Sequence, residues 1–236
     1  MSKMGKDKWI GVWEKPSDSL KAQVGRWEYH DIELISKNII EILKITKDDI
    51  VLDVCCGNGL ITKRIAESCK EIHGVDFSEF LIETAKRKNN GENIYYHCDD
   101  ALNIDKKFKE NTFSKAYCYF SLQHFSYKKG EILIKVLSKV TNSNGLILIG
   151  DIPDIRRIWR FYDTPKKKLS FFIDFISCKI RGVGGWNSLD SMGWWWNPYR
   201  IKKICDRMNL KCEILEQDRN LPHAYYRFDV LVSKRV

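Results

Sequence analysis

Apolar residues along the first two thirds of this chain follow two alternating patterns. Short runs rich in β-branched residues predict strands, whereas apolar positions three or four residues apart predict helices. The predicted strands are residues 50–54, 71–76, 93–98, 113–120 and 145–150, and the predicted helices are 36–43, 60–69, 80–88 and a segment that ends at 140. This strict alternation is typical of a parallel sheet with helices on both faces.

The alternation stops after residue 153. Residues 154–196 are rich in aromatic and basic side chains, which is too aromatic a composition for a disordered linker. An Asn197-Pro198 pair then supplies a good N-cap and first turn for a helix that reaches Met208. Residues 211–216 and 225–233 predict two final strands. The predicted fold is therefore a Rossmann-like α/β doubly wound sheet, mostly parallel, with a C-terminal antiparallel hairpin and an inserted lid segment.

The length of the chain and its cysteines narrow the class of protein. A chain of 236 residues with 44% hydrophobic composition suits one domain with one core. No apolar run approaches the roughly 20 residues of a membrane span, and no apolar signal segment follows the charged N-terminus, so we expect a soluble, cytoplasmic protein without a membrane partner. The 8 cysteines include no Cys-x-x-Cys pair. We expect reduced thiols and no metal site.

A glycine turn and a distant acid carry the strongest chemical signal. Gly57 and Gly59 lie between the strand at 50–54 and the helix that begins at residue 60, where glycine lets a ligand approach the main chain and the helix N–H groups. Asp76 ends the next strand, where a carboxylate can accept hydrogen bonds from two ribose hydroxyls. A dinucleotide fingerprint would place its third glycine where this chain has Thr62, which disfavours NAD and FAD.

With this turn and acid, residues 45–153 resemble the class I S-adenosylmethionine (AdoMet)-dependent methyltransferases, with a plausible continuation to the C-terminus. The resemblance implies AdoMet as cofactor and S-adenosylhomocysteine as product. It also implies that Gly57 and Gly59 admit the methionine portion, that Asp76 binds the ribose, and that residues near the ends of the strands contact the rest of the cofactor. The predicted cofactor-binding residues are Asp53, Cys55, Gly57, Gly59, Asp76, Phe77, Asp100, Ala101, Phe120, Ser121 and, in the N-terminal segment, Tyr29.

The same resemblance divides the single domain into parts. Residues 1–35 are expected to cover the cofactor or substrate, 45–153 form the AdoMet-binding core, and 197–236 supply the last helix and strands. The inserted residues 154–196 are expected either to cover the acceptor or to pack their aromatic side chains on the edge of the sheet.

Methyl transfer needs few acid-base groups because the sulfonium already activates the methyl carbon. An acceptor hydroxyl of high pKa nevertheless needs a base. His124, just after strand 113–120, is the best candidate by position, although it could instead cap the following helix. Asp151 and His30 are weaker candidates. Strand 113–120 is followed neither by an Asn-Pro-Pro-Tyr type of sequence nor by a Pro-Cys pair, which counts against adenine-N6, glutamine and cytosine-C5 methylation.

The leading hypothesis is methyl transfer to oxygen or nitrogen of a small, anionic metabolite, phosphorylated or nucleotide-linked. A net charge of +9 and the arginines at 156, 157 and 160 favour a negative acceptor. The same charge favours an RNA methyltransferase as the alternative, although no RNA-binding module is recognisable. A non-catalytic AdoMet-binding subunit is the third hypothesis, and the intact glycines and acids argue against it.

Overall fold

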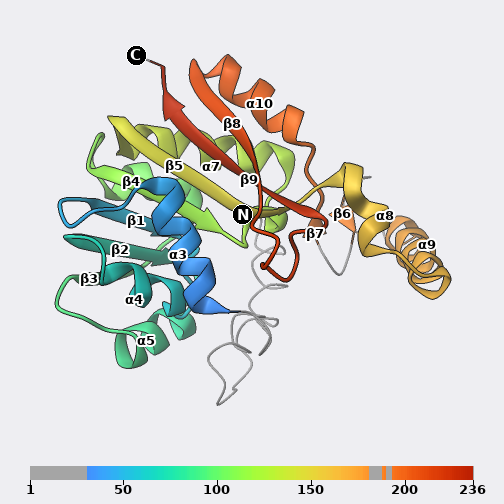
Figure 1. Ribbon diagram of the computed structural model, residues 1–236, viewed down its shortest axis with the longest axis horizontal. Coiled ribbons are helices and arrows are strands. Elements are labelled where there is room, and N and C mark those ends of the chain that lie inside the picture. The colour runs from blue at the N-terminus through green and yellow to red at the C-terminus, as the bar shows by residue number, and fades with distance from the viewer. Residues whose placement is uncertain (1–30, 181–187, 190–192, 236) are drawn as a thin grey trace.

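The architecture is a seven-stranded sheet between layers of helices, seen in a computed structural model that describes residues 31–180, 188–189 and 193–235 (Figure 1). The strand order is β3-β2-β1-β4-β5-β9-β8. The strands are β1 (Ile50–Val54), β2 (Glu71–Asp76), β3 (Ile94–Cys98), β4 (Phe113–Tyr119), β5 (Thr141–Pro153), β8 (Leu210–Glu216) and β9 (Arg227–Lys234). This order confirms the predicted Rossmann-like fold.

The order in which successive strands are added to the sheet reverses at β1: β2 and β3 lie on one side of it, and β4 and β5 lie on the other. β1 pairs in parallel with both β2 and β4, while β3 lies outside β2 and β5 lies outside β4. The gap between the ends of β1 and β4 is thus a topological switch point, the place where open α/β sheets bind their ligands. β9 pairs antiparallel with β5 and with β8, which confirms the predicted C-terminal hairpin.

Two apolar clusters occupy the two faces of the sheet. One contains side chains of α3 and α4 with residues of β1, β2 and β4, and the other contains side chains of α7 and α10. The helices are α3 (Ile32–Leu43), α4 (Leu60–Ala66), α5 (Glu79–Lys88), α6 (Ile104–Lys107), α7 (Tyr127–Val140) and α10 (Pro198–Arg207), with short 3-10 turns η1 (Ala101–Asn103) and η2 (Leu122–His124). Asn197 caps α10 by accepting a hydrogen bond from the Tyr199 N–H, as its position before Pro198 predicts.

β5 is much longer than the predicted 145–150. Its start pairs Thr141 with Phe113, and the register then shifts before Lys115 pairs with Leu146. Its end continues to Pro153 because β9 pairs with it there, Ile152 opposite Phe228 and Pro153 opposite Arg227. Polar residues at 142–144 hide the first part from a pattern of apolar positions.

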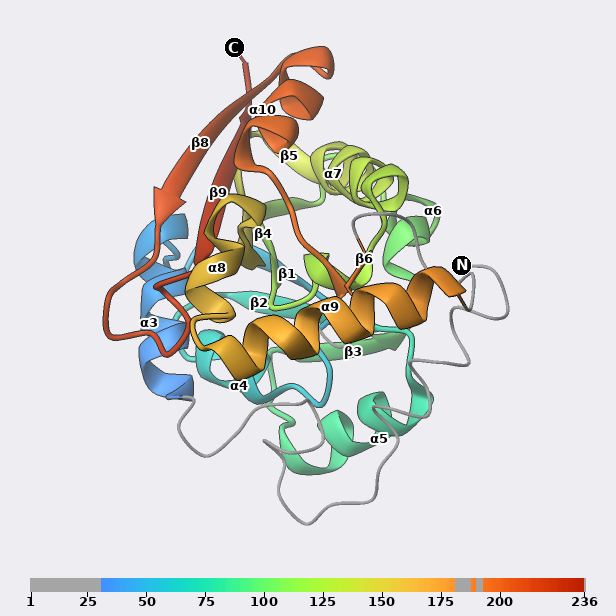
Figure 2. The same ribbon diagram turned by 90° about the vertical axis from the view of Figure 1, so that its right-hand side faces the viewer.

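The inserted segment after β5 contains regular structure and part of the core. It holds η3 (Ile155–Arg157), α8 (Ile158–Phe161), α9 (Pro165–Ile180) and the short strands β6 (Ser188–Leu189) and β7 (Gly193–Trp194). Trp195 and Trp196 are fully buried. The Trp196 indole donates to the Leu122 carbonyl at 3.2 Å, so this part of the insertion belongs to the body of the domain. Figure 2 shows α9 lying across the end of the molecule that this insertion covers.

Candidate cofactor and acceptor site

Three neighbouring strands end in residues with left-handed backbone conformation. Cys55 after β1 has φ 64°, Phe120 after β4 has φ 62°, and Asp151 near the end of β5 has φ 58°. Positive φ is uncommon outside glycine, and such strain collects at functional sites. Since β1, β4 and β5 are adjacent in the sheet, the three residues mark one region at the switch point. The predicted site lies in the same region.

Asp76 joins the two motifs that lie far apart in the sequence. Its Oδ2 accepts a hydrogen bond from the Gly57 N–H at 3.0 Å, and its Oδ1 accepts one from the Ser78 N–H at 3.0 Å. Burial raises the pKa of this carboxyl, while the two backbone hydrogen bonds oppose that shift. Each carboxylate oxygen can still accept a second bond, so Asp76 has the geometry to bind ribose hydroxyls beside the glycine turn.

Asp53 has a partner that the sequence analysis did not foresee. Its Oδ2 accepts a hydrogen bond from the Thr62 hydroxyl at 2.6 Å, and both side chains are buried. The threonine at the position of the missing third glycine therefore ties the first turn of α4 to β1. A polar residue in the otherwise apolar inner face of this helix was the signal for that contact.

Gly59 is required by packing as well as by its φ of 79°. A Cβ at this position would lie 2.3 Å from the Tyr96 hydroxyl. That hydroxyl donates to the Asn89 carbonyl at 2.8 Å, and the Asn89 amide donates to the Asn58 carbonyl at 2.7 Å. Tyr96 and Asn89 thus brace the glycine turn from the side of β3. Neither residue was among those predicted from the sequence.

The predicted adenine-facing residues lie next to Asp76. The Asp99 N–H donates to the Asp76 carbonyl at 2.9 Å, which joins the ends of β3 and β2. Asp100 caps η1 through a 3.0 Å bond from the Leu102 N–H to its Oδ1, and Ala101 is buried behind it. Phe77 follows Asp76 directly and is half-buried. Their place at the β2 and β3 ends agrees with the predicted adenine contacts, which stay predictions.

The end of β4 brings Phe120, Ser121 and His124 together. The Phe120 N–H donates to the Gly150 carbonyl at 3.0 Å, and the Arg227 guanidinium lies 4.9 Å from the centre of the Phe120 ring. The Ser121 hydroxyl donates to the Tyr119 carbonyl at 3.1 Å. His124 ends η2, and burial, with a smaller effect of Arg227, lowers its pKa to about 3. His124 is therefore neutral at physiological pH.

Asp151, a predicted catalytic residue, belongs to a buried polar cluster. Its Oδ2 pairs with Arg227 Nη1 at 3.0 Å, and its Oδ1 accepts from the Gln217 amide at 3.2 Å. Asp229 accepts from the same amide at 2.8 Å and from the Asp151 N–H at 2.8 Å. We infer that Asp151 mainly positions the end of β5. Arg227 and Asp229 were missed, although two charges at alternate positions of an apolar strand could have revealed them.

The cluster makes stability depend on pH. Burial raises the pKa of Asp229 to about 7, far above the ordinary value near 3.9 that it regains on unfolding. The folded protein therefore binds a proton between about pH 4 and pH 7 that the unfolded chain has lost, and stability falls as pH rises through that range.

Asp229→Asn keeps a side-chain oxygen that can accept both hydrogen bonds but cannot ionise. Between pH 5 and pH 8 the parent should lose roughly 2 kcal/mol more of its free energy of unfolding than the variant, which corresponds to about 5 °C in Tm. Thermal melts of both proteins at the two pH values measure the difference, and equal pH dependence would refute the assignment.

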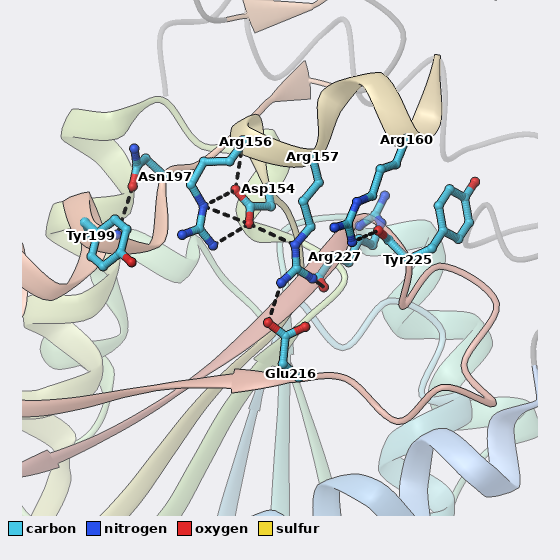
Figure 3. Close-up of polar contacts among 9 residues, drawn as sticks. All are labelled: Asp154, Arg156, Arg157, Arg160, Asn197, Tyr199, Glu216, Tyr225 and Arg227. Atoms are coloured by element: carbon cyan, nitrogen blue, oxygen red, sulfur yellow. Dashed lines mark hydrogen bonds and ion pairs between the residues drawn. The ribbon is translucent and has the colours of Figure 1, made fainter. Parts of the chain in front are cut away.

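The arginines after β5 form ion pairs or hydrogen bonds with other residues of the chain (Figure 3). Arg156 makes a two-pronged pair with buried Asp154, with Nη2 2.7 Å from Oδ2, and stacks 5.1 Å above the Tyr199 ring. Arg157 pairs with Asp154 and with Glu216. Arg160 donates to the Tyr225 carbonyl at 3.2 Å. Arg156 and Arg157 are thus paired with acids of the chain and Arg160 is hydrogen-bonded to a carbonyl, so these contacts give no direct support to a negatively charged acceptor.

The seven cysteines with described side chains are free, and the side-chain hydrogen bond of the Cys55 thiol with Cys118, together with burial, raises the pKa of Cys55 well above its ordinary value. A thiolate at Cys55 is therefore disfavoured. Within the described ranges, no group of acidic, histidine or cysteine side chains could hold a metal ion. Tyr29 and His30 lie outside the described residues, as does most of the predicted cover at 1–35.

Comparison with known proteins agrees with this geometry. Residues 51–145 match a family model described as a methyltransferase domain. Over these residues the chain is similar to methyltransferase domains, in agreement with its resemblance to the class I AdoMet-dependent methyltransferases. The matched range begins in β1 and ends in β5, so it contains the glycine turn, Asp76 and the end of β4.

Curated relatives match parts of the chain. A probable cobalt-precorrin-6B C(15)-methyltransferase (decarboxylating) of Methanococcus vannielii is 36% identical over 75 residues, which are 30% of this chain and 42% of that protein. A demethylmenaquinone methyltransferase of Staphylococcus epidermidis is 27% identical over 136 residues, covering 53% and 54%. The chain thus spans about half or less of the length of these relatives.

Solved structures share the fold over the whole chain. An AdoMet-dependent methyltransferase from Anabaena variabilis superimposes with a TM-score of 0.66 and 16% identity, covering 100% of this chain and 96% of that one. Magnesium protoporphyrin IX methyltransferase from Synechocystis, with bound S-adenosylhomocysteine, gives a TM-score of 0.60 and 14% identity, covering 99% and 95%. At these identities the likeness shows the fold alone.

Proposed function

We propose that this protein transfers the methyl group of AdoMet to an oxygen or nitrogen atom of a small molecule. The observation that carries the proposal is the hydrogen bond from the Gly57 N–H to the Asp76 carboxylate at 3.0 Å. This bond holds Asp76, the proposed ribose-binding acid, beside the glycine turn at the switch point of the sheet. The family match over residues 51–145 supports the same cofactor.

The reaction needs alignment more than acid-base chemistry. A lone pair of the acceptor forms a bond to the methyl carbon while the carbon–sulfur bond breaks and its electrons stay on sulfur, which gives S-adenosylhomocysteine. Phe120 and Ser121 at the end of β4 are proposed to lie beside the sulfonium, and the insertion is proposed to exclude water from it. An acceptor that carries a hydrogen must also lose a proton, and neutral His124 is the proposed recipient.

A small molecule is the best-supported class of acceptor. The names of the relatives include a demethylmenaquinone methyltransferase, a 2-phytyl-1,4-naphtoquinone methyltransferase and a cobalt-precorrin methyltransferase, and one structural neighbour methylates magnesium protoporphyrin IX. Nothing in these likenesses supports an RNA acceptor. That the acceptor is anionic, phosphorylated or nucleotide-linked stays a prediction, since Arg156 and Arg157 are paired within the chain. Activity assays on charged and uncharged acceptors would decide it.

Binding of AdoMet is the first test. Asp76→Ala should weaken the affinity at least tenfold, because hydrogen bonds to a charged carboxylate contribute about 1.5–3 kcal/mol. Calorimetric titration of the parent and the variant with AdoMet measures this. Asp105→Ala is the matched control, since that acid forms a surface pair with Lys139 at 3.2 Å. An unchanged affinity in Asp76→Ala, with parental thermal stability, would overturn the assignment of the site.

A further inference from the structure

Helix α9 presents an apolar surface to solvent on the side away from the body of the domain. Leu169, Phe172, Ile173 and Ile176 are 51–61% exposed. They are spaced by one, three and four residues, which gathers them on one side of a helix. Phe171 and Phe175 lie on the opposite side and pack against the cluster of Ile158, Tyr162, Trp195 and Tyr226. Packing of the inner side holds α9 on the domain, whereas no packing within the described residues explains the apolar residues of the outer side.

Trp159 of α8 extends this surface, which we define as the α9 outer face: Trp159, Leu169, Phe172, Ile173 and Ile176. The Trp159 ring is 49% exposed and lies 6.3 Å from the Phe172 ring. Of the nine large apolar or aromatic side chains that are exposed among the described residues, five belong to this face. Single exposed apolar residues are ordinary, whereas a contiguous group marks an interaction site.

The charges around the α9 outer face are mainly positive. Lys166, Lys167 and Lys168 form the first turn of α9 and are all exposed, and Arg160 lies on α8. Asp163 and Lys167 neutralise each other in an ion pair of 2.8 Å, and Asp174 is half-buried, so the positive charge of this segment comes mainly from Lys166, Lys168 and Arg160. A partner that matches this face must therefore combine an apolar layer with negative charge beside it.

We propose that the α9 outer face docks on the surface of an anionic lipid bilayer. An amphipathic helix lying in the plane of a membrane buries aliphatic and aromatic side chains at the boundary of the acyl chains while lysines contact anionic headgroups. Tryptophan prefers this interfacial level. None of the described helices is long and apolar enough to cross a membrane, so the contact is peripheral. Figure 2 shows the full length of α9 on the outside of the molecule.

The proposal does not rest on methyl transfer, and vesicle sedimentation tests it. The protein should sediment with vesicles of phosphatidylcholine mixed with phosphatidylglycerol and much less with phosphatidylcholine alone. Phe172→Ser combined with Ile176→Ser should lower the partition coefficient by roughly tenfold or more. Lys166→Gln combined with Lys168→Gln should weaken binding to the anionic vesicles only. Ile132→Ser is the matched control: this exposed apolar residue belongs to α7 and not to the α9 outer face, and its replacement should leave binding unchanged.

Three results would overturn the proposal. They are absence of sedimentation with anionic vesicles, equal binding to both vesicle types, and equal binding by the Phe172 and Ile176 double variant. A self-association of the parent that this variant abolishes, without vesicle binding, would show that a second copy covers the face instead. AdoMet titration of every variant checks that the fold is intact. It also separates the two proposals, because AdoMet binding without vesicle binding refutes only the docking.

Discussion

Replacing Gly57 with valine should reduce AdoMet affinity by roughly 100-fold, to below detection by ordinary calorimetry. Gly57 has φ 58°, where a β-branched side chain is strongly disfavoured. Valine would rotate the backbone and move the N–H of residue 57, which donates a 3.0 Å hydrogen bond to Asp76, away from that carboxylate. Strain and the lost charged hydrogen bond together cost about 3 kcal/mol, which corresponds to this loss in affinity.

The fold should survive that substitution, because the turn is held from several sides. The Cys55 and Cys56 N–H groups donate to the Val75 carbonyl at 2.8 and 3.1 Å, and the Thr62 hydroxyl ties α4 to Asp53. Thermal melting should therefore show a change in Tm of only a few degrees, whereas calorimetry should show that AdoMet binding is lost. Gly91→Val, in the exposed loop before β3, is the matched control and should bind AdoMet normally. Normal binding by Gly57→Val would remove the turn from the cofactor site.

Replacing His124 with alanine should lower kcat about 100-fold for an acceptor that must lose a proton, at the low end of general-base effects because a base of low pKa has little driving force. The pKa of His124 is lowered to about 3, chiefly by burial, so the imidazole is already neutral above that pH. The kcat profile should consequently show no histidine inflection near pH 6.5. The loss should shrink as pH rises and the acceptor ionises by itself, with KM for AdoMet unchanged.

His124→Gln separates a chemical role from a structural one. Glutamine can replace hydrogen bonds of the imidazole, for example toward the Gln123 amide 3.4 Å away, but it cannot accept a proton. A base at His124 predicts equal losses of kcat in both variants. Recovery of activity in His124→Gln, or a loss in His124→Ala that is the same at every pH, would instead assign the residue to positioning of η2.

The sequence by itself determined the alternating core and the glycine turn after β1. β1 and β2 have the predicted bounds, because their apolar runs are bounded by strong turn signals at Gly57 and Ser78. Local pattern is sufficient there, since each element buries one continuous face. That Gly57 and Asp76 belong to one site was likewise predictable, because parallel neighbouring strands end at the same edge, whereas the hydrogen bond between them is a finding of the structure.

Only the tertiary structure decided the partners of the buried polar groups and the fate of the aromatic insertion. Asp151, Gln217, Arg227 and Asp229 come from three separate segments, and no local pattern specifies that their side chains meet. The aromatic insertion was expected either to cover the acceptor or to pack its aromatic side chains on the edge of the sheet. Trp195 and Trp196 are core residues, whereas most of the exposed apolar side chains of the insertion belong to α9. Composition gives the amount of aromatic surface, whereas burial depends on which side of each element faces the sheet, and that is fixed by long-range packing.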